Sequence, residues 1–163
     1  MKNLFLLAMV LPIFTGVAAQ STVEKKLYDP AANAETQIAV VVEAAAQHGK
    51  FVLIVAGGNW CSWCIEFNRF CHENHSIDSL LEHSFVEYHL NYSKENKNLP
   101  VFRNYGFPQR FGFPVFIILD GKGNRIHTQN SSYLEKGESY DDKKVLEFLS
   151  DWSPDALDPS KYK

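Results

Sequence analysis

Residues 51–67 read FVLIVAGGNWCSWCIEF, and they hold the strongest structural signal in the chain. Positions 51–56 form a continuous apolar run, as expected of a strand that is buried on both faces. A tight connection at 57–60 follows, and a helix-compatible segment begins at Cys61. Cys61 and Cys64 lie two residues apart at the start of this helix. Strand, turn and helix in this order form the setting in which a CxxC pair is redox-active.

The position of the two thiols at a helix start assigns them different roles. A helix N-terminus carries partial positive charge and free N–H groups, and both favour the thiolate at Cys61. Cys64, in the first turn, is close enough to form a disulfide with Cys61. We therefore expect Cys61 to be the nucleophile and Cys64 the residue that resolves its mixed disulfide.

Two other uses of these cysteines stay open at this stage. A structural disulfide usually joins distant segments, because closing so short a loop removes little chain entropy. Zinc is the second alternative, since Cys61, Cys64, Cys71 and His75 have the composition of a zinc site. However, Cys71 falls inside the same expected helix, whereas zinc ligands are normally divided between a turn and a later element. We expect no metal and no organic cofactor.

The beginning of the chain has the pattern of an export signal. Lys2 is followed by an apolar stretch at 4–14 and by the small residues 17–19, which predicts a signal peptide at 1–19. An uncleaved anchor is the alternative. We expect a periplasmic or secreted protein without stable membrane insertion once the signal is removed. The formal net charge of −3 argues against nucleic acid as a partner.

The rest of the sequence alternates between helical and strand patterns. We expect helices from the Asn33 cap to about His48 and at about 61–72, 77–83, 98–105 and 141–152, and strands at 51–56, 85–90, 115–119 and 125–129. This order predicts a three-layer α/β sandwich with a mixed sheet. The polar stretch 130–140 is expected to be a solvated loop.

The element order carries a family resemblance. With Trp60-Cys61-x-x-Cys64 after the first strand and Gly112-Phe113-Pro114 before the third, residues 35–152 resemble the thioredoxin superfamily. The chain looks most like secreted bacterial thioredoxin-like proteins labelled disulfide isomerases. It is also similar to the DsbD-type C-terminal thioredoxin domain, which shares the Cys-x-x-Cys-x-Glu-Phe pattern of 61–67.

The resemblance implies a fold and a division of the chain. We expect a thioredoxin fold with a central mixed four-stranded sheet and an extra N-terminal helix. The expected segments are a signal peptide at 1–19, an N-terminal extension at 20–34, a thioredoxin-like domain at 35–152 and a tail at 153–163.

The resemblance also implies a substrate-binding surface. Pro114 corresponds to the cis-proline that faces the CxxC pair, which would leave the backbone of Phe113 free to pair with an extended substrate. Trp60 and Trp63 flank the thiols and are candidates for an aromatic contact surface. We expect Trp63 to be the more exposed of the two.

Three positions depart from the family pattern. The buried Asp of thioredoxin, six residues before its first Cys, is Val55 here, and its companion Lys falls at His89. The Glu that DsbD-type domains carry four residues after the second Cys is Asn68. Proton transfer at Cys64 is therefore left to water, Glu66 or His89.

These observations predict a thiol–disulfide oxidoreductase that acts on protein disulfides, of the reductase or isomerase type. Its partners would be proteins with disulfides or thiols, together with a redox partner that the sequence does not identify. A redox-regulated peptide-binding or chaperone-like module is the alternative. Cys71 is expected to be an inert core thiol, because a disulfide with Cys64 would span about 10 Å along the helix axis.

Overall fold

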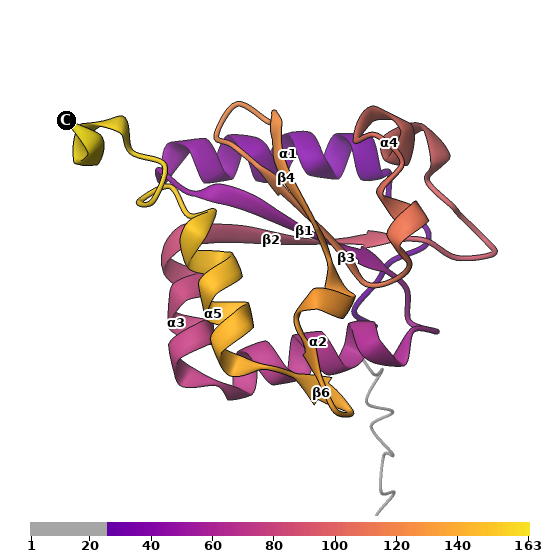
Figure 1. The fold of residues 1–163 in the computed structure, drawn as a ribbon. Helices are drawn as coiled ribbons and strands as arrows, with labels where there is room; N and C mark the ends of the chain where they lie inside the picture. Colours follow the sequence, from indigo (N-terminus) through magenta and orange to yellow (C-terminus); the bar gives the residue numbers. More distant parts are fainter. Residues whose placement is uncertain (1–25) are drawn as a thin grey trace, which may run out of the picture.

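The computed structural model describes residues 26–163, so the expected signal peptide at 1–19 lies outside the described residues. Four strands form one sheet in the order β2-β1-β3-β4, with helices on both faces (Figure 1). The strands of this sheet are β1 (Phe51–Gly57), β2 (Phe85–Asn91), β3 (Val115–Leu119) and β4 (Arg125–Asn130). The helices are α1 (Ala34–Gln47), α2 (Ser62–Glu73), α3 (His75–Ser84), α4 (Leu99–Asn104) and α5 (Asp142–Asp151).

The apolar run at the centre of the sequence becomes the centre of the sheet. β1 pairs in parallel with β2 and antiparallel with β3, so the sheet is mixed, as predicted. Residues 52–57 are all buried. Such a strand needs apolar side chains on both faces, which is why the run shows no alternation.

Two apolar clusters fill the spaces between the sheet and its helices. α1 and α4 cover one face, packing on Val52, Ile54 and Ala56 of β1. α2, α3 and α5 cover the other face, packing on Leu53 and Val55 (Figure 1). The predicted three-layer sandwich with an extra N-terminal helix is therefore confirmed.

Asx side chains cap the N-termini of α1 and α5. Asn33 accepts a hydrogen bond from the backbone N–H of Thr36 at 3.1 Å and caps α1, as the sequence predicted. Asp141 caps α5 by accepting from the N–H groups of Lys143 and Lys144. These bonds satisfy N–H groups that have no partner within the helix.

The segment between β4 and α5 is folded, so the expectation of a solvated loop was wrong. It contains a short 3₁₀ helix (Ser131–Tyr133) and a hairpin of β5 (Glu135–Lys136) and β6 (Ser139–Tyr140). Leu134 and Tyr140 are each only 4% exposed and join the cluster under α2. Two apolar side chains in a polar stretch are too few to form a readable pattern, but they anchor the hairpin on α2.

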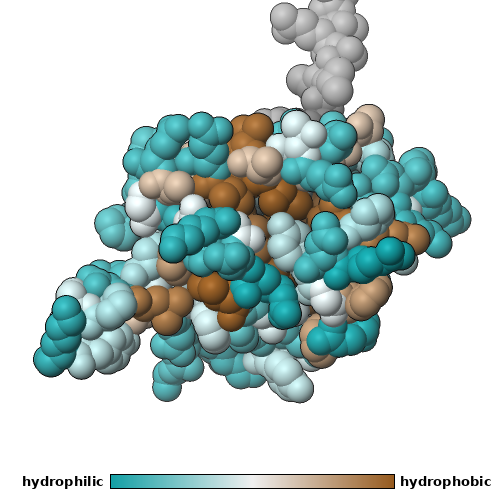
Figure 2. All heavy atoms as spheres, turned by 90° about the horizontal axis from the view of Figure 1, so that it is seen from above, coloured by the Kyte–Doolittle hydropathy of each residue, from teal (hydrophilic) through white to brown (hydrophobic). Residues whose placement is uncertain are grey.

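The outer surface is mixed in character. Seen from above α1, it is largely hydrophilic, with apolar side chains nearer its centre (Figure 2). Val40 of α1 is 56% exposed. Within residues 26–163, no helix has both the length and the apolar character needed to cross a membrane.

The start of α2 lies against the end of β1, and this contact depends on a glycine. Gly57 is the last residue of β1. A Cβ added at Gly57 would overlap the Sγ of Cys64 and lie 3.1 Å from the Oη of Tyr28. The absence of a side chain at Gly57 therefore lets the first turn of α2 approach the sheet.

We predict that Gly57→Ala lowers the free energy of unfolding by about 1–3 kcal/mol, because the added methyl group must displace Cys64. Gly121→Ala is the matched control: its added Cβ would meet its nearest atoms at 3.9 Å, an ordinary contact. That variant should stay within about 0.5 kcal/mol of the parent protein. Urea denaturation of the three proteins measures the difference, and equal stability of both variants would contradict the packing argument.

Candidate active site

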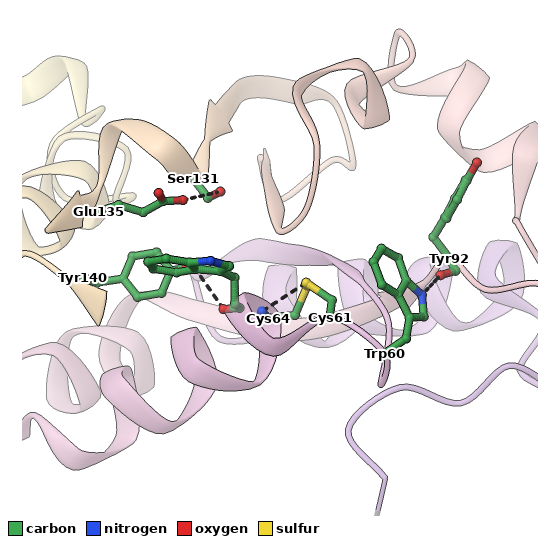
Figure 3. The surroundings of a disulfide bond; sticks show 8 residues. Trp60, Cys61, Cys64, Tyr92, Ser131, Glu135 and Tyr140 are labelled. Atoms are coloured by element: carbon green, nitrogen blue, oxygen red, sulfur yellow. Dashed lines mark hydrogen bonds between the residues drawn. A yellow bond between two sulfur atoms is a disulfide. The ribbon is translucent and has the colours of Figure 1, made fainter. Parts of the chain in front are cut away.

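Cys61 and Cys64 form a disulfide at the N-terminus of α2 (Figure 3). Cys61 is the N-cap residue, and its Sγ accepts a hydrogen bond from the backbone N–H of Cys64 at 3.2 Å. The Cα atoms of the two cysteines are 5.3 Å apart. The spacing predicted from the sequence therefore places both sulfurs at the helix start, where N–H groups point toward the first one.

The two cysteines differ in their access to solvent. Cys61 is 6% exposed, whereas Cys64 is completely buried. Together with the fully buried Tyr28 they form a small apolar cluster, against which Leu27, Trp63 and Phe113 pack. A partner molecule can thus approach the pair through Cys61 and not through Cys64.

Trp60 forms one side of the site. Its ring is 60% exposed and meets Phe113 edge-to-face, with centroids 5.7 Å apart. Its Nε1–H donates to the backbone carbonyl of Tyr92 at 2.7 Å, which fixes the ring beside the disulfide (Figure 3). Trp60 is therefore an exposed but oriented aromatic surface.

Trp63 is the less exposed tryptophan, so the expectation that it would be the more exposed one was wrong. It is half-buried and meets Tyr140 edge-to-face at 5.4 Å. Its backbone carbonyl accepts a hydrogen bond from the Tyr140 hydroxyl at 3.0 Å. The hairpin covers Trp63, a contact between distant segments that no local pattern indicates.

Phe113 and Pro114 lie directly before β3. The peptide bond between them is cis. The Phe113 ring packs on the cysteine cluster and also contacts Tyr92, with ring centroids 4.8 Å apart. The segment before β3 thus borders the disulfide from the side of Trp60.

A groove extends from Trp60 away from the disulfide. Its volume is about 570 Å³, and its lining residues include Pro30, Trp60, Tyr92, Lys26, Lys94 and Lys97. Aromatic side chains next to a redox pair offer an apolar contact for a polypeptide, and the lysines give the rim positive charge.

The two expected proton carriers have different surroundings. His89 lies opposite Val55 in the β1–β2 register, and burial lowers its pKa to about 4, so its imidazole is neutral near pH 7. Its Nε2 is buried without a hydrogen-bond partner among residues 26–163. The Glu66 carboxylate binds Arg69 and accepts from the Ser139 hydroxyl at 2.5 Å, and these bonds lower its pKa. The structure thus directs Glu66 toward Arg69 and the hairpin.

Cys71 is a free thiol in the core under α2. It is 1% exposed, and its pKa is raised, first by burial and then by the charges of Glu87 and Asp78. This environment agrees with the expected inert thiol. Within the described part of the chain, no group of three or more His, Cys, Asp or Glu side chains is arranged to hold a metal ion.

Tyr28 is a site residue that the sequence analysis did not identify. Its ring meets His89 edge-to-face, with centroids 5.3 Å apart, and its hydroxyl would lie 3.1 Å from a Cβ added at Gly57. Asn59 holds its backbone from both sides, accepting from the Tyr28 N–H at 3.1 Å and donating to its carbonyl at 2.7 Å. The one sequence feature that could have indicated its burial was an aromatic residue within the polar segment before α1.

Known proteins with a thioredoxin-like fold match this chain in sequence and in structure. The family model described as "Thioredoxin-like" matches residues 33–121. The disulphide isomerase from Xylella fastidiosa Temecula1 is similar in structure, with a TM-score of 0.66 and 24% identity over 76% of this chain and 93% of that one. The C-terminal domain of DsbD from Neisseria meningitidis gives a TM-score of 0.53 and 17% identity over 74% of this chain and 97% of that one. No curated protein matches the chain.

The family match covers more than half of the 163 residues, and the sheet order, the helix layers and the placement of the cysteine pair agree with it. The chain belongs to the thioredoxin-like family.

Proposed function

We propose that this protein is a thiol–disulfide oxidoreductase that acts on protein disulfides through Cys61 and Cys64. The observation that carries the proposal is the asymmetry of the pair. Cys61 caps α2 with slight solvent access, while Cys64 lies fully buried behind it. Such a pair can attack through one sulfur and resolve through the other.

The reaction balances without a cofactor. In the reduced protein, the Cys61 thiolate attacks one sulfur of a substrate disulfide, forming a mixed disulfide and releasing a substrate thiolate that takes up a proton. The Cys64 thiol then loses its proton, and its sulfur attacks Cys61. The second substrate sulfur leaves and becomes a thiol. The substrate is reduced by two electrons, and the protein gains the Cys61–Cys64 disulfide.

The proposal extends to the direction in which the protein exchanges disulfides. We favour a reductase or isomerase, in line with the disulphide isomerase and the DsbD domain that share the fold. Its partners would be proteins with disulfides or thiols and a separate dithiol protein that reduces it again. The pattern at 1–19 supports a periplasmic or secreted location, where protein disulfides form.

The first prediction concerns the nucleophile. When the reduced protein is treated with limiting iodoacetamide, Cys61 should carry nearly all of the label, because Cys64 and Cys71 are buried. Peptide mapping by mass spectrometry identifies the modified residue. Preferential labelling of Cys64 or Cys71 would overturn the assignment of Cys61.

The second prediction concerns the mixed disulfide. Cys64→Ala removes the resolving thiol. This variant should therefore accumulate mixed disulfides in which Cys61 is bonded to a cysteine of a substrate protein. Cys61→Ala should not, because the remaining Cys64 is 0% exposed. Non-reducing gels compare the two variants. Equal trapping by both, or none by either, would favour the peptide-binding module over the enzyme.

The third prediction concerns the aromatic surface. Trp60→Ala should raise the KM for a protein disulfide such as insulin about tenfold, as expected when a central aromatic contact is lost. Its rate with a small disulfide reagent should change little. Tyr162→Ala, which removes an exposed aromatic ring near the C-terminus, is the control. An unchanged KM in Trp60→Ala would exclude this surface from substrate binding.

A further inference from the structure

Tyr28 is held rigidly, yet its hydroxyl has no visible role in the oxidised protein. The side chain is 0% exposed, and Asn59 fixes its backbone with two hydrogen bonds. The hydroxyl is buried without a hydrogen-bond partner in the part of the chain that the structure describes. A buried hydroxyl without a partner is unfavourable, and phenylalanine would pack in the same place without that cost.

The hydroxyl and the Cys64 sulfur border one space at the end of β1. The space beside Gly57 is bordered by the Sγ of Cys64 and by the Oη of Tyr28, the two atoms closest to a Cβ added there. Tyr28, Cys61 and Cys64 form one buried cluster. Tyr28 is therefore a buried polar group that the fold brings into the same cluster as Cys64.

The chemistry of the two groups is complementary only in the reduced protein. Burial raises the pKa of Tyr28, so the phenol keeps its proton and acts as a hydrogen-bond donor. A disulfide sulfur is a weak acceptor, whereas a thiolate is a strong one. Within the apolar cluster around the pair, Tyr28 contributes a side-chain hydroxyl that can donate to a Cys64 thiolate.

We propose that the Tyr28 hydroxyl donates a hydrogen bond to the Cys64 thiolate and so promotes the step in which Cys64 attacks the mixed disulfide at Cys61. This inference rests on the proposed function. It assigns to Tyr28 the support of Cys64 that the buried acid of thioredoxin would supply, since Val55 stands at the position of that acid. Tyr28 remains a phenol throughout. The proton of Cys64 passes to the departing substrate thiolate by way of solvent, so no further reactant is required.

The neighbouring titratable groups do not compete for this role near neutral pH. His89, which packs against the Tyr28 ring, is neutral because burial lowers its pKa to about 4. Burial also raises the pKa of Tyr140 on the other side of the site, so that phenol keeps its proton. Cys61 is bonded to the substrate during this step. The Glu66 carboxyl group on α2 keeps its negative charge near neutral pH, because the hydrogen bond from Arg69 lowers its pKa.

The experiment measures the rate at which Cys64 attacks a mixed disulfide at Cys61. The reduced protein reacts with limiting dithiobis(nitrobenzoate), which forms a mixed disulfide at Cys61 and releases one coloured thiolate. Attack by Cys64 then releases a second one, and stopped-flow absorbance gives its rate across pH. The variants are Tyr28→Phe, which keeps the ring and removes the hydroxyl, and Tyr105→Phe, a control whose ring packs on the opposite face of the sheet.

We expect Tyr28→Phe to slow the second release about tenfold at pH 7 and to move the pH of half-maximal rate upward by about one unit, with the rates converging at high pH. At a pH above the Cys64 pKa of both proteins, the equilibrium with a reference dithiol should shift about tenfold toward the disulfide, or about 30 mV, whereas at pH 7, where Cys64 is a thiol, the two equilibria should agree. Tyr105→Phe should match the parent protein in both measurements.

Each outcome separates this inference from the proposed function. If the parent protein releases no second thiolate, the proposed function itself fails. If the parent protein does so and Tyr28→Phe has the same rate and the same pH profile, only the role of Tyr28 is overturned. A rate that falls equally at every pH would also overturn it, because it would show that Tyr28 serves only to pack the site.

Discussion

The contact between Cys64 and Gly57 is the constraint on which the rest of the site depends. Because Gly57 has no side chain, the first turn of α2 lies directly against the end of β1, and Cys64 is buried there beside Tyr28. This placement leaves Cys61 at the N-cap, with the Cys64 N–H directed at its sulfur. A helix start held farther from the sheet would expose both sulfurs to solvent and remove the difference between them. The unequal burial of the pair is therefore a consequence of one strand–helix contact.

The two sides of the site are built differently. On one side Trp60 is exposed but oriented by its bond to Tyr92, and a groove continues beyond it. On the other side the hairpin packs on α2 and Tyr140 holds the backbone of Trp63 (Figure 3). The first side offers apolar surface that a partner can still cover, whereas the second side is already covered by the chain itself. A polypeptide that reaches Cys61 is therefore expected to lie along Trp60 and Phe113.

The interior around the sulfurs stabilises a thiolate with dipoles and not with charges. The apolar cluster around the pair includes Tyr28, Leu27 and Phe113, and the nearby His89 is kept neutral by its burial. Val55 occupies the place where thioredoxin carries a buried acid. An isolated charge in such a pocket would be costly, but a backbone N–H or a phenol hydroxyl can support a thiolate while remaining neutral. One such donor, the Cys64 N–H, is directed at the Cys61 sulfur, and the Tyr28 hydroxyl is the second donor in our proposal.

The amino-acid pattern alone determined the layers of the fold and the location of the reactive pair. The apolar run at 51–56, the Asn33 cap and the CxxC spacing are local signals, because strand burial, helix capping and disulfide reach depend on residues close in sequence. Three features were decided only by the tertiary structure. Leu134 and Tyr140 of the hairpin pack in the core, Trp60 is more exposed than Trp63, and Tyr28 lies in the same buried cluster as Cys64. Each of these joins segments far apart in the chain, such as Tyr28 and Asn59 or Trp63 and Tyr140. Their side chains take these positions because of the packing of the whole domain, which no short stretch of sequence encodes.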